Sequence, residues 1–404
     1  MLYILFLFLI PISSIKMQCS PPHKHAPTIP DARLVSMALF LRHGLRTPTD
    51  SHFYISKSEI GNWVCDSEYS EAPRNHFSIY PENSNSKSKI SRRYFNQLDA
   101  NLVEYPPNCQ QGDLLVQGMK QLYDLGQFYQ QYLIHELRFL PRIIHPEYME
   151  LRSSYVERTF RSGESFMAGL YPPVTPNERI TFMTGSDSSD YLTTDPAFCQ
   201  ELQKDCDYFG NSEELKQRIE EDYLHYKDIY NALNITYSSS NWMLLGDYLS
   251  LLYCTDQKFP SRINKLIDDK IFNRTQSDLA FYYYGCFNVT KGVASAPIFR
   301  DLFRMLEEKN SEKRFFLFSA HDTTIMSILS TFDYTDTAVP TFGSHLALEF
   351  WEKPKGSGKK YIRMVLNGEE IAIGDDGKTT LMEYNQFKEK LVKIGMNRFC
   401  KEYP

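Results

Sequence analysis

Two arginines flank a histidine in residues 41–48, whose sequence is LRHGLRTP. An arginine guanidinium binds phosphate oxygens in a bidentate manner and stays charged at any biological pH. A neutral imidazole between two such groups can attack the phosphorus atom that they hold and polarise. The spacing therefore favours phosphoryl transfer through a phosphohistidine, with His43 as the nucleophile and Arg42 and Arg46 as phosphate ligands. The alternative at this stage is a histidine that only packs in the fold.

A second polar motif, SAHDTT at residues 319–324, lies between two apolar segments. The segment 314–319 is typical of a buried strand, and the segment 325–329 is typical of a helix. Because a helix N-terminus binds anions, His321 is a candidate phosphate ligand. Asp322 is a candidate general acid for the leaving oxygen. The structural alternative for Asp322 is a helix N-cap.

Strands must place these motifs at one edge of a sheet. The apolar run 34–41 predicts a buried strand directly before the first motif, and 148–152 predicts another strand that ends at Arg152. Residue spacing predicts helices at 117–137, 156–170 and 300–309. Segments 345–351 and 361–366 are predicted strands that pair through a turn at 354–359. This alternation is typical of an α/β sheet, whose ligands bind at the carboxyl ends of the strands.

Residues 186–295 differ from the rest of the chain because they are richer in Tyr, Asp and Glu. Helical spacing near 213–231 and 243–252 predicts a mostly helical cap, inserted into an α/β domain of residues 33–185 and 296–400. Residues 50–107 predict a long polar excursion, partly disordered, which Cys65 and Cys109 can tie together.

The first ten residues form an apolar run that is too short for a typical membrane-spanning helix. We interpret residues 1–19 as a signal peptide, with an uncleaved short anchor as the alternative. No later stretch is long and apolar enough to span a bilayer. Residues 20–32 form a Pro-rich leader with little reason to pack.

Eight cysteines and three glycosylation sequons are typical of an oxidising compartment. No two cysteines form a C-x-x-C pair, which argues against a structural zinc site. The sequons, all within the predicted cap, are those of Asn234, Asn273 and Asn288. We therefore expect a secreted or luminal protein. The net charge of −6 gives no reason to expect nucleic acid, so a local basic cluster must attract any anionic substrate.

The order of three motifs resembles the histidine acid phosphatases, one branch of the histidine phosphatase superfamily. These motifs are RHGLRTP at 42–48, RSSYVERT at 152–159 and SAHDTT at 319–324. The segments 125–127, 169–173 and 340–350 are similar too. The resemblance implies a phosphoglycerate-mutase-like fold, with a mixed six-stranded sheet flanked by helices and an inserted helical cap. It also implies phosphomonoester hydrolysis through a phosphohistidine, without a cofactor. No metal is expected either, since arginines can neutralise the phosphate.

The same resemblance implies roles for individual residues. His43 would be the nucleophile and Asp322 the proton donor. The phosphate clamp would consist of Arg42, Arg46, Arg152 and His321.

Several positions depart from the family pattern. Leu45 stands where the family often has Asp, and Tyr155 where the middle motif often has Asp. His345 replaces a cysteine whose usual partner is Cys254, so Cys206 and Cys286 become alternative partners for Cys254. The resemblance also implies a Cys199–Cys400 disulfide.

Some features are similar to the subgroup of 2-phosphoxylose phosphatases, such as the placing of Cys65 and Cys109 on either side of the long excursion. Arg152 and the short N-terminal apolar run argue against that subgroup. One alternative is a phosphatase dedicated to a phosphorylated glycan, the 2-phosphoxylose of the proteoglycan linkage, or to an inositol phosphate. The others are a phosphoglycerate-mutase-like isomerase and a catalytically inactive secreted binding protein. The natural substrate and a homodimeric state stay open.

Overall fold

The computed structural model of the chain describes residues 17–49, 63–65, 104–105, 109–172, 180–185, 190–196, 199–335, 338–353, 359–397 and 399–400. The apolar core of the predicted signal peptide, most of the polar excursion and nearly all of the turn at 354–359 lie outside these ranges. None of the described helices is both long and apolar enough to cross a lipid bilayer.

A mixed sheet forms the centre of the molecule. Strand β1 (Arg33–Arg42) runs parallel to β6 (Phe315–Ala320), which in turn runs parallel to β4 (Met149–Ser153). On its other side β1 is antiparallel to β7 (His345–Glu352), followed by β8 (Lys360–Leu366). The resemblance implied six strands, but eight belong to this sheet in the described residues. The short strands that extend its edges are β5 (Met183–Thr184), β9 (Glu369–Ile371) and β10 (Leu381–Glu383).

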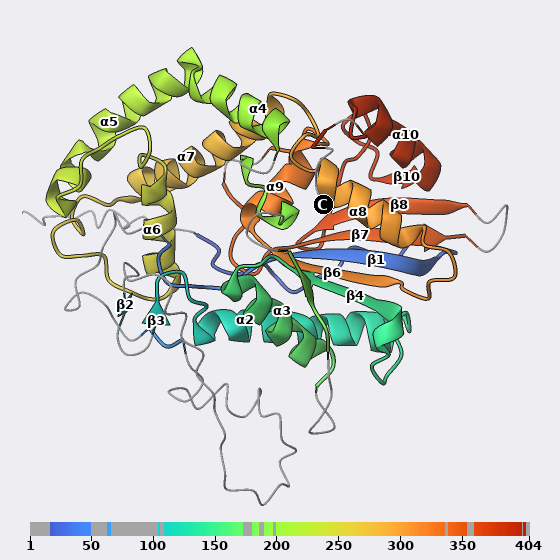
Figure 1. The fold of residues 1–404 in the computed structure, drawn as a ribbon. Coiled ribbons are helices and arrows are strands. Elements are labelled where there is room, and N and C mark those ends of the chain that lie inside the picture. Colours follow the sequence, from blue (N-terminus) through green and yellow to red (C-terminus); the bar gives the residue numbers. More distant parts are fainter. Residues whose placement is uncertain are drawn as a thin grey trace, which may run out of the picture.

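Helices cover both faces of this sheet, as Figure 1 shows. One face packs against α2 (Val116–Tyr129) and α3 (Glu157–Leu170), and Met37, Leu39 and Leu41 of β1 point into that layer. The intervening Ala38 and Phe40 point into the opposite layer. This second layer contains α8 (Ala296–Leu306), α9 (Asp322–Ser330) and α10 (Tyr384–Ile394). The predicted fold class, a mixed sheet flanked by helices, is confirmed.

Helices also fill the range predicted as the cap. These are α4 (Gln200–Gly210), α5 (Glu213–Leu233), α6 (Leu244–Cys254) and α7 (Asp269–Asn288). In Figure 1 they arch beyond one end of the sheet. The three sequon asparagines are exposed: Asn273 and Asn288 lie on α7, and Asn234 directly follows α5. Their glycosylation stays a prediction.

Smaller elements complete the described chain. The predicted helix 117–137 ends at Tyr129 and continues as the π-helical turn η2 (Gln130–Glu136). Short 3₁₀ turns are η3 (Pro146–Tyr148) and η4 (Tyr191–Thr193). Strands β2 (Glu104–Tyr105) and β3 (Cys109–Gln110) form a separate two-stranded ribbon.

The segment 17–32 is anchored to the helices although many of its residues are exposed, so the prediction that residues 20–32 have little reason to pack is wrong. The His25 ring stacks on Tyr132 with ring centroids 4.0 Å apart, and Ala26 is buried in the core shared with α2. A disulfide joins Cys19 to Cys254 at the end of α6. Aromatic contacts and a covalent bond thus replace the apolar periodicity that the sequence lacks.

The disulfides include the two expected pairs, Cys65–Cys109 and Cys199–Cys400. Both alternatives predicted for Cys254 are wrong, because the N-terminal segment brings Cys19 to it. Cys206 and Cys286 bond to each other instead, where α4 packs against α7.

Candidate active site

The loop after β1, residues 43–48, is held directly against the first turn of α2. A Cβ on Gly44 would overlap the backbone of Gly118, and a Cβ on Gly118 would overlap the backbone of Leu45. The Leu45 N–H donates to the Gln121 Oε1 at 2.9 Å, and the Leu45 carbonyl accepts from the Leu115 N–H at 2.9 Å. Gly44 is therefore required for a close approach rather than for a positive φ.

His43 is 98% buried, and its Nδ1 lies 2.9 Å from its neighbour's carbonyl, Gly44 O. Because a carbonyl can only accept, Nδ1 carries the proton and Nε2 keeps its lone pair. Burial, followed by the charges of Arg158, Arg46 and Arg42, lowers the pKa of His43 well below its usual value. A neutral imidazole with a free Nε2 is the nucleophilic form.

Arg42 is buried, and both of its terminal nitrogens are engaged. Nη1 donates to the Pro340 carbonyl, and Nη2 lies 2.8 Å from Asp322 Oδ2. The guanidinium also lies over the ring of Phe342, 4.2 Å from its centroid. Only the buried Nε–H has no hydrogen-bond partner among the described residues.

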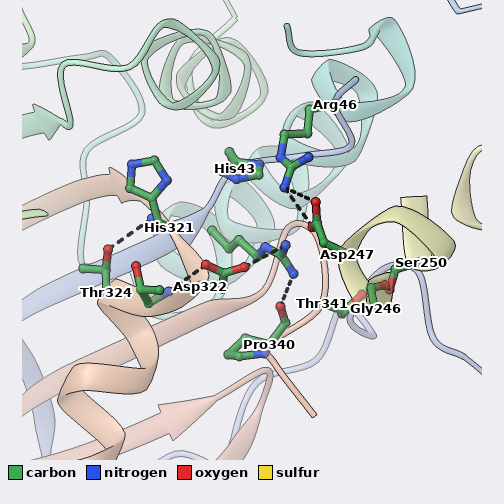
Figure 2. A network of polar contacts seen from close by, with 12 residues as sticks. His43, Arg46, Gly246, Asp247, Ser250, His321, Asp322, Thr324, Pro340 and Thr341 are labelled. Atoms are coloured by element: carbon green, nitrogen blue, oxygen red, sulfur yellow. Dashed lines mark hydrogen bonds and ion pairs between the residues drawn. The ribbon is translucent and has the colours of Figure 1, made fainter. Parts of the chain in front are cut away.

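Arg46 repeats this arrangement with a partner from the cap. Its Nη2 contacts Asp247 Oδ1 at 2.8 Å and Oδ2 at 2.9 Å, and its Nη1 donates to the Thr47 carbonyl at 3.1 Å. Figure 2 shows Asp247 reaching Arg46 from α6, next to His43. The buried Nε–H of Arg46, like that of Arg42, has no partner in the described part of the chain.

Arg158, in the first turn of α3, is a third guanidinium that the sequence analysis did not assign to the site. Burial and the neighbouring Arg46 lower its pKa to about 9. Its charge is the largest electrostatic influence on the pKa values of both His43 and His321. Its Nε–H is buried and also lacks a partner within the described ranges. Three unsatisfied N–H groups on three cations are a strong recognition element for an anion.

Arg152 lies apart from this cluster, contrary to the expectation from the sequence. Its Nη1 contacts Tyr191 Oη at 2.7 Å and Asp301 Oδ2 at 2.8 Å. Arg152 and Glu150 share one face of β4, and alternation along the strand points them toward α8, which carries Asp301. The first arginine of the motif 152–159 thus leaves the site, and the second, Arg158, enters it.

The β6–α9 connection contributes His321 and Asp322. The helix begins at Asp322, with His321 as the N-cap residue, so the N-cap alternative for Asp322 is wrong. The His321 Nε2 lies 2.9 Å from Ser154 Oγ, and its ring stands edge-on to that of His43, with centroids 5.7 Å apart. Burial and Arg158 lower the pKa of His321 well below its usual value.

Asp322 is held at both carboxylate oxygens. Oδ1 accepts from the Thr323 N–H at 2.8 Å, while Oδ2 faces Arg42. The structure thus brings five predicted residues together: Arg42, His43, Arg46, His321 and Asp322. It adds Arg158, Asp247 and Phe342. The motif at 152–159 already contained a signal for Arg158, whereas the sequence offered none for Asp247.

Comparison with known proteins agrees with this geometry. The chain matches the profile of the histidine phosphatase superfamily (branch 2) over residues 33–367. It is 24% identical over 374 residues to 2-phosphoxylose phosphatase 1 of Xenopus tropicalis, covering 86% of this chain and 70% of that protein. It is 21% identical over 404 residues to a probable acid phosphatase of Dictyostelium discoideum, covering 89% and 78% respectively.

Among solved structures, the apo form of Hafnia alvei phytase superposes with a TM-score of 0.60. The sequences are 14% identical, and the match covers 91% of this chain and 98% of the phytase. This likeness concerns the fold. The profile match over most of the chain shows that the protein belongs to branch 2 of the histidine phosphatase superfamily.

Proposed function

We propose that this protein is a metal-independent phosphomonoester hydrolase, an acid phosphatase, that acts through a phosphohistidine at His43. The observation that carries the proposal is a set of three buried Nε–H groups near one neutral histidine, none of which has a partner among the described residues. They belong to Arg42, Arg46 and Arg158. Such a set binds a phosphate dianion and leaves an imidazole lone pair free to react with it.

The first half-reaction transfers the phosphoryl group to the protein. The arginines hold the phosphate while His43 Nε2 attacks phosphorus, and the bond from phosphorus to the ester oxygen breaks. Asp322 gives its proton to the departing oxygen. Asp322 pairs with Arg42 in the structure. A bound phosphate also contacts Arg42 and so competes with the Asp322 carboxylate for that guanidinium.

The second half-reaction regenerates the site. The Asp322 carboxylate takes a proton from water as the water oxygen attacks phosphorus, and the bond from phosphorus to His43 Nε2 breaks. Inorganic phosphate leaves, and His43 is again neutral. The guanidiniums provide the charge stabilisation that a metal ion supplies in other phosphatases.

Four disulfides indicate a protein of the secretory pathway. We propose a secreted or luminal location, with exposed Asn234, Asn273 and Asn288 as glycosylation sites. A signal peptide of residues 1–19 would remove Cys19 and break its bond to Cys254. Any cleavage is therefore expected to fall before Cys19.

The alternatives from the sequence are not favoured over this reading. A phosphatase dedicated to a glycan or inositol phosphate would use the same groups and differ only in what surrounds the leaving group. An inactive binding protein has no need of a histidine held with its Nε2 free beside a general acid.

The test is hydrolysis of p-nitrophenyl phosphate from pH 3 to 9. Wild type should show an acidic optimum that is insensitive to a metal chelator. His43→Ala should lose on the order of 10⁴-fold in kcat or more, as expected for a covalent nucleophile. The control is His135→Ala, a change at an exposed histidine of η2. A folded His43→Ala variant with activity near that of wild type would refute the proposal.

A further inference from the structure

We infer that Asp247 makes the cap a charge filter: it fixes Arg46 within the clamp, and it selects against phosphomonoesters whose leaving group carries further negative charge. The inference rests on the proposed function and deepens it, because it names the class of leaving group. The favoured substrates are monophosphates of neutral, hydroxyl-bearing molecules.

The contact between Asp247 and Arg46 joins two regions far apart in the sequence. Both carboxylate oxygens lie within 2.9 Å of one nitrogen, Arg46 Nη2. The side chain of Arg46 is 7% exposed, and that of Asp247 is 18% exposed. Asp247 is therefore mostly shielded from water, so its charge acts on nearby groups with little screening.

Asp247 is held rigidly by the packing of α6 on α7. A Cβ on Gly246 would overlap the Thr275 carbonyl oxygen, so the two helices approach backbone to backbone at this point. The Gln276 Nε2 donates to the Gly246 carbonyl at 2.9 Å, and the Gln276 Oε1 accepts from Ser250 Oγ at 2.6 Å. Figure 2 shows Gly246 and Ser250 next to Asp247 on α6. The carboxylate cannot move away without disturbing this helix pair.

Asp322 marks the position of the leaving oxygen, since it is the proposed proton donor. Helix α7 packs on α9 through a cluster that contains Met326 and places Tyr283 beside the site. After burial, Asp322 and then Asp247 are the largest influences that raise the pKa of Tyr283. The charges of both carboxylates therefore act on this one phenol.

This arrangement suits a hydroxyl group and repels an anion. A substrate hydroxyl can donate to the Asp247 carboxylate and exchange a hydrogen bond with Tyr283. A second phosphate in the same place would face the Asp247 carboxylate at short range. The overall charge of −6 gives such a polyanion no compensating attraction.

The experiment compares kcat/KM for fructose 6-phosphate and fructose 1,6-bisphosphate, which differ by one phosphate, with phenyl phosphate as the reference substrate. Wild type should prefer the monophosphate by about tenfold or more. Asp247→Asn removes the charge but can still accept one hydrogen bond from Arg46. It should narrow the ratio of the two kcat/KM values about tenfold, mainly through a lower KM for the bisphosphate.

A second variant separates positioning from selectivity. Asp247→Ala leaves Arg46 without its partner and should lower kcat/KM for all three substrates, with part of the loss recovered in Asp247→Asn. The matched control is Asp228→Asn, the same charge change at an exposed position of α5. It should leave the rates and the ratio unchanged.

The outcomes distinguish this inference from the proposed function. Phenyl phosphate hydrolysis with no preference for the monophosphate, or a preference that survives in Asp247→Asn, would overturn the charge filter and leave the phosphatase mechanism standing. If wild type hydrolyses none of the three substrates, the proposed function fails and the charge filter fails with it.

Discussion

We call the ends of strands β1, β6 and β7, with the connection from β6 to α9, the floor of the site. The floor and the cap each supply one carboxylate to a clamp arginine, Arg42 and Arg46 respectively. On the floor, Arg42 pairs with Asp322; Arg42 is the last residue of β1, and Asp322 lies two residues after the end of the neighbouring strand β6. From the cap, Asp247 pairs with Arg46 across 201 residues of sequence. The floor therefore fixes the nucleophile and the general acid relative to one another, whereas the cap holds Arg46 in the clamp and adds a negative charge. The reacting groups thus belong to the floor, and the proposed selectivity belongs to the cap.

The largest expected effect concerns Asp322, the proposed general acid on the floor of the site. Asp322→Asn keeps the hydrogen bond from Thr323 but has no acidic proton. It should lower kcat for glycerol 2-phosphate about 10³-fold, because an alkoxide leaves poorly without protonation. The loss with p-nitrophenyl phosphate should be about tenfold or less. Equal losses for the two substrates would contradict the assignment of Asp322 as the general acid.

The next effect compares two arginines of the same motif. Arg158→Ala should lower kcat/KM for p-nitrophenyl phosphate about 10²-fold to 10³-fold, since it removes one charged donor from the clamp. Arg152→Ala is the matched control, because its guanidinium binds Asp301 and Tyr191 on the other side of β4. Its kcat/KM should stay within a few-fold of wild type. A larger loss of kcat/KM in Arg152→Ala than in Arg158→Ala would contradict this assignment and indicate that Arg152 binds the phosphate.

The smallest expected effect is that the stability of the floor and the stability of the cap change in opposite directions with pH. On the floor, burial lowers the pKa of His345 to about 3. Between pH 6.5 and 3 the unfolded chain binds a proton there that the folded chain excludes. For such a histidine, the free energy of unfolding therefore decreases by about 1.4 kcal/mol per pH unit as the pH falls through this range.

In the cap, burial and the nearby Asp278 raise the pKa of Asp222 to about 7. The folded state holds that proton between pH 3.8 and 7, so this stabilising contribution is present at low pH and is lost as the pH rises. Hydrogen exchange at pH 4–7, corrected for the intrinsic rate, should show faster exchange in β1 and β7 and slower exchange in α5 on acidification. A parallel trend in both regions would contradict the prediction.

The sequence predicted the floor better than the cap, for physical reasons. A continuous apolar run predicted a strand at 34–41, and the structure has β1 at 33–42. In the cap, the 20-residue helix α7 was missed because its buried face includes Thr275, Gln276 and Asp278. Thr275 bonds to the backbone of α7 itself, whereas Gln276 bonds to α6 and Asp278 to α5. The buried face is therefore partly polar, and the apolar periodicity is broken.

The errors within the site have a similar origin. The motif 152–159 holds two arginines, and only the alternation of β4 and the start of α3 decide which one faces His43. The contact of Asp247 depends on the docking of a helix, and no local pattern encodes it. Cys19 falls at the end of the predicted signal peptide, residues 1–19, so its bond to Cys254 was not expected.

The most direct test of the mechanism is to trap the phosphoenzyme. Wild type is quenched rapidly, without acid, during turnover of a ³²P-labelled phosphomonoester, and the labelled peptide is then mapped. The label should appear on His43 as an acid-labile, alkali-stable phosphoramidate, and it should be absent from His43→Ala. Label on any other residue, or turnover with no phosphoenzyme even when the second half-reaction is slowed in Asp322→Asn, would contradict the phosphohistidine mechanism.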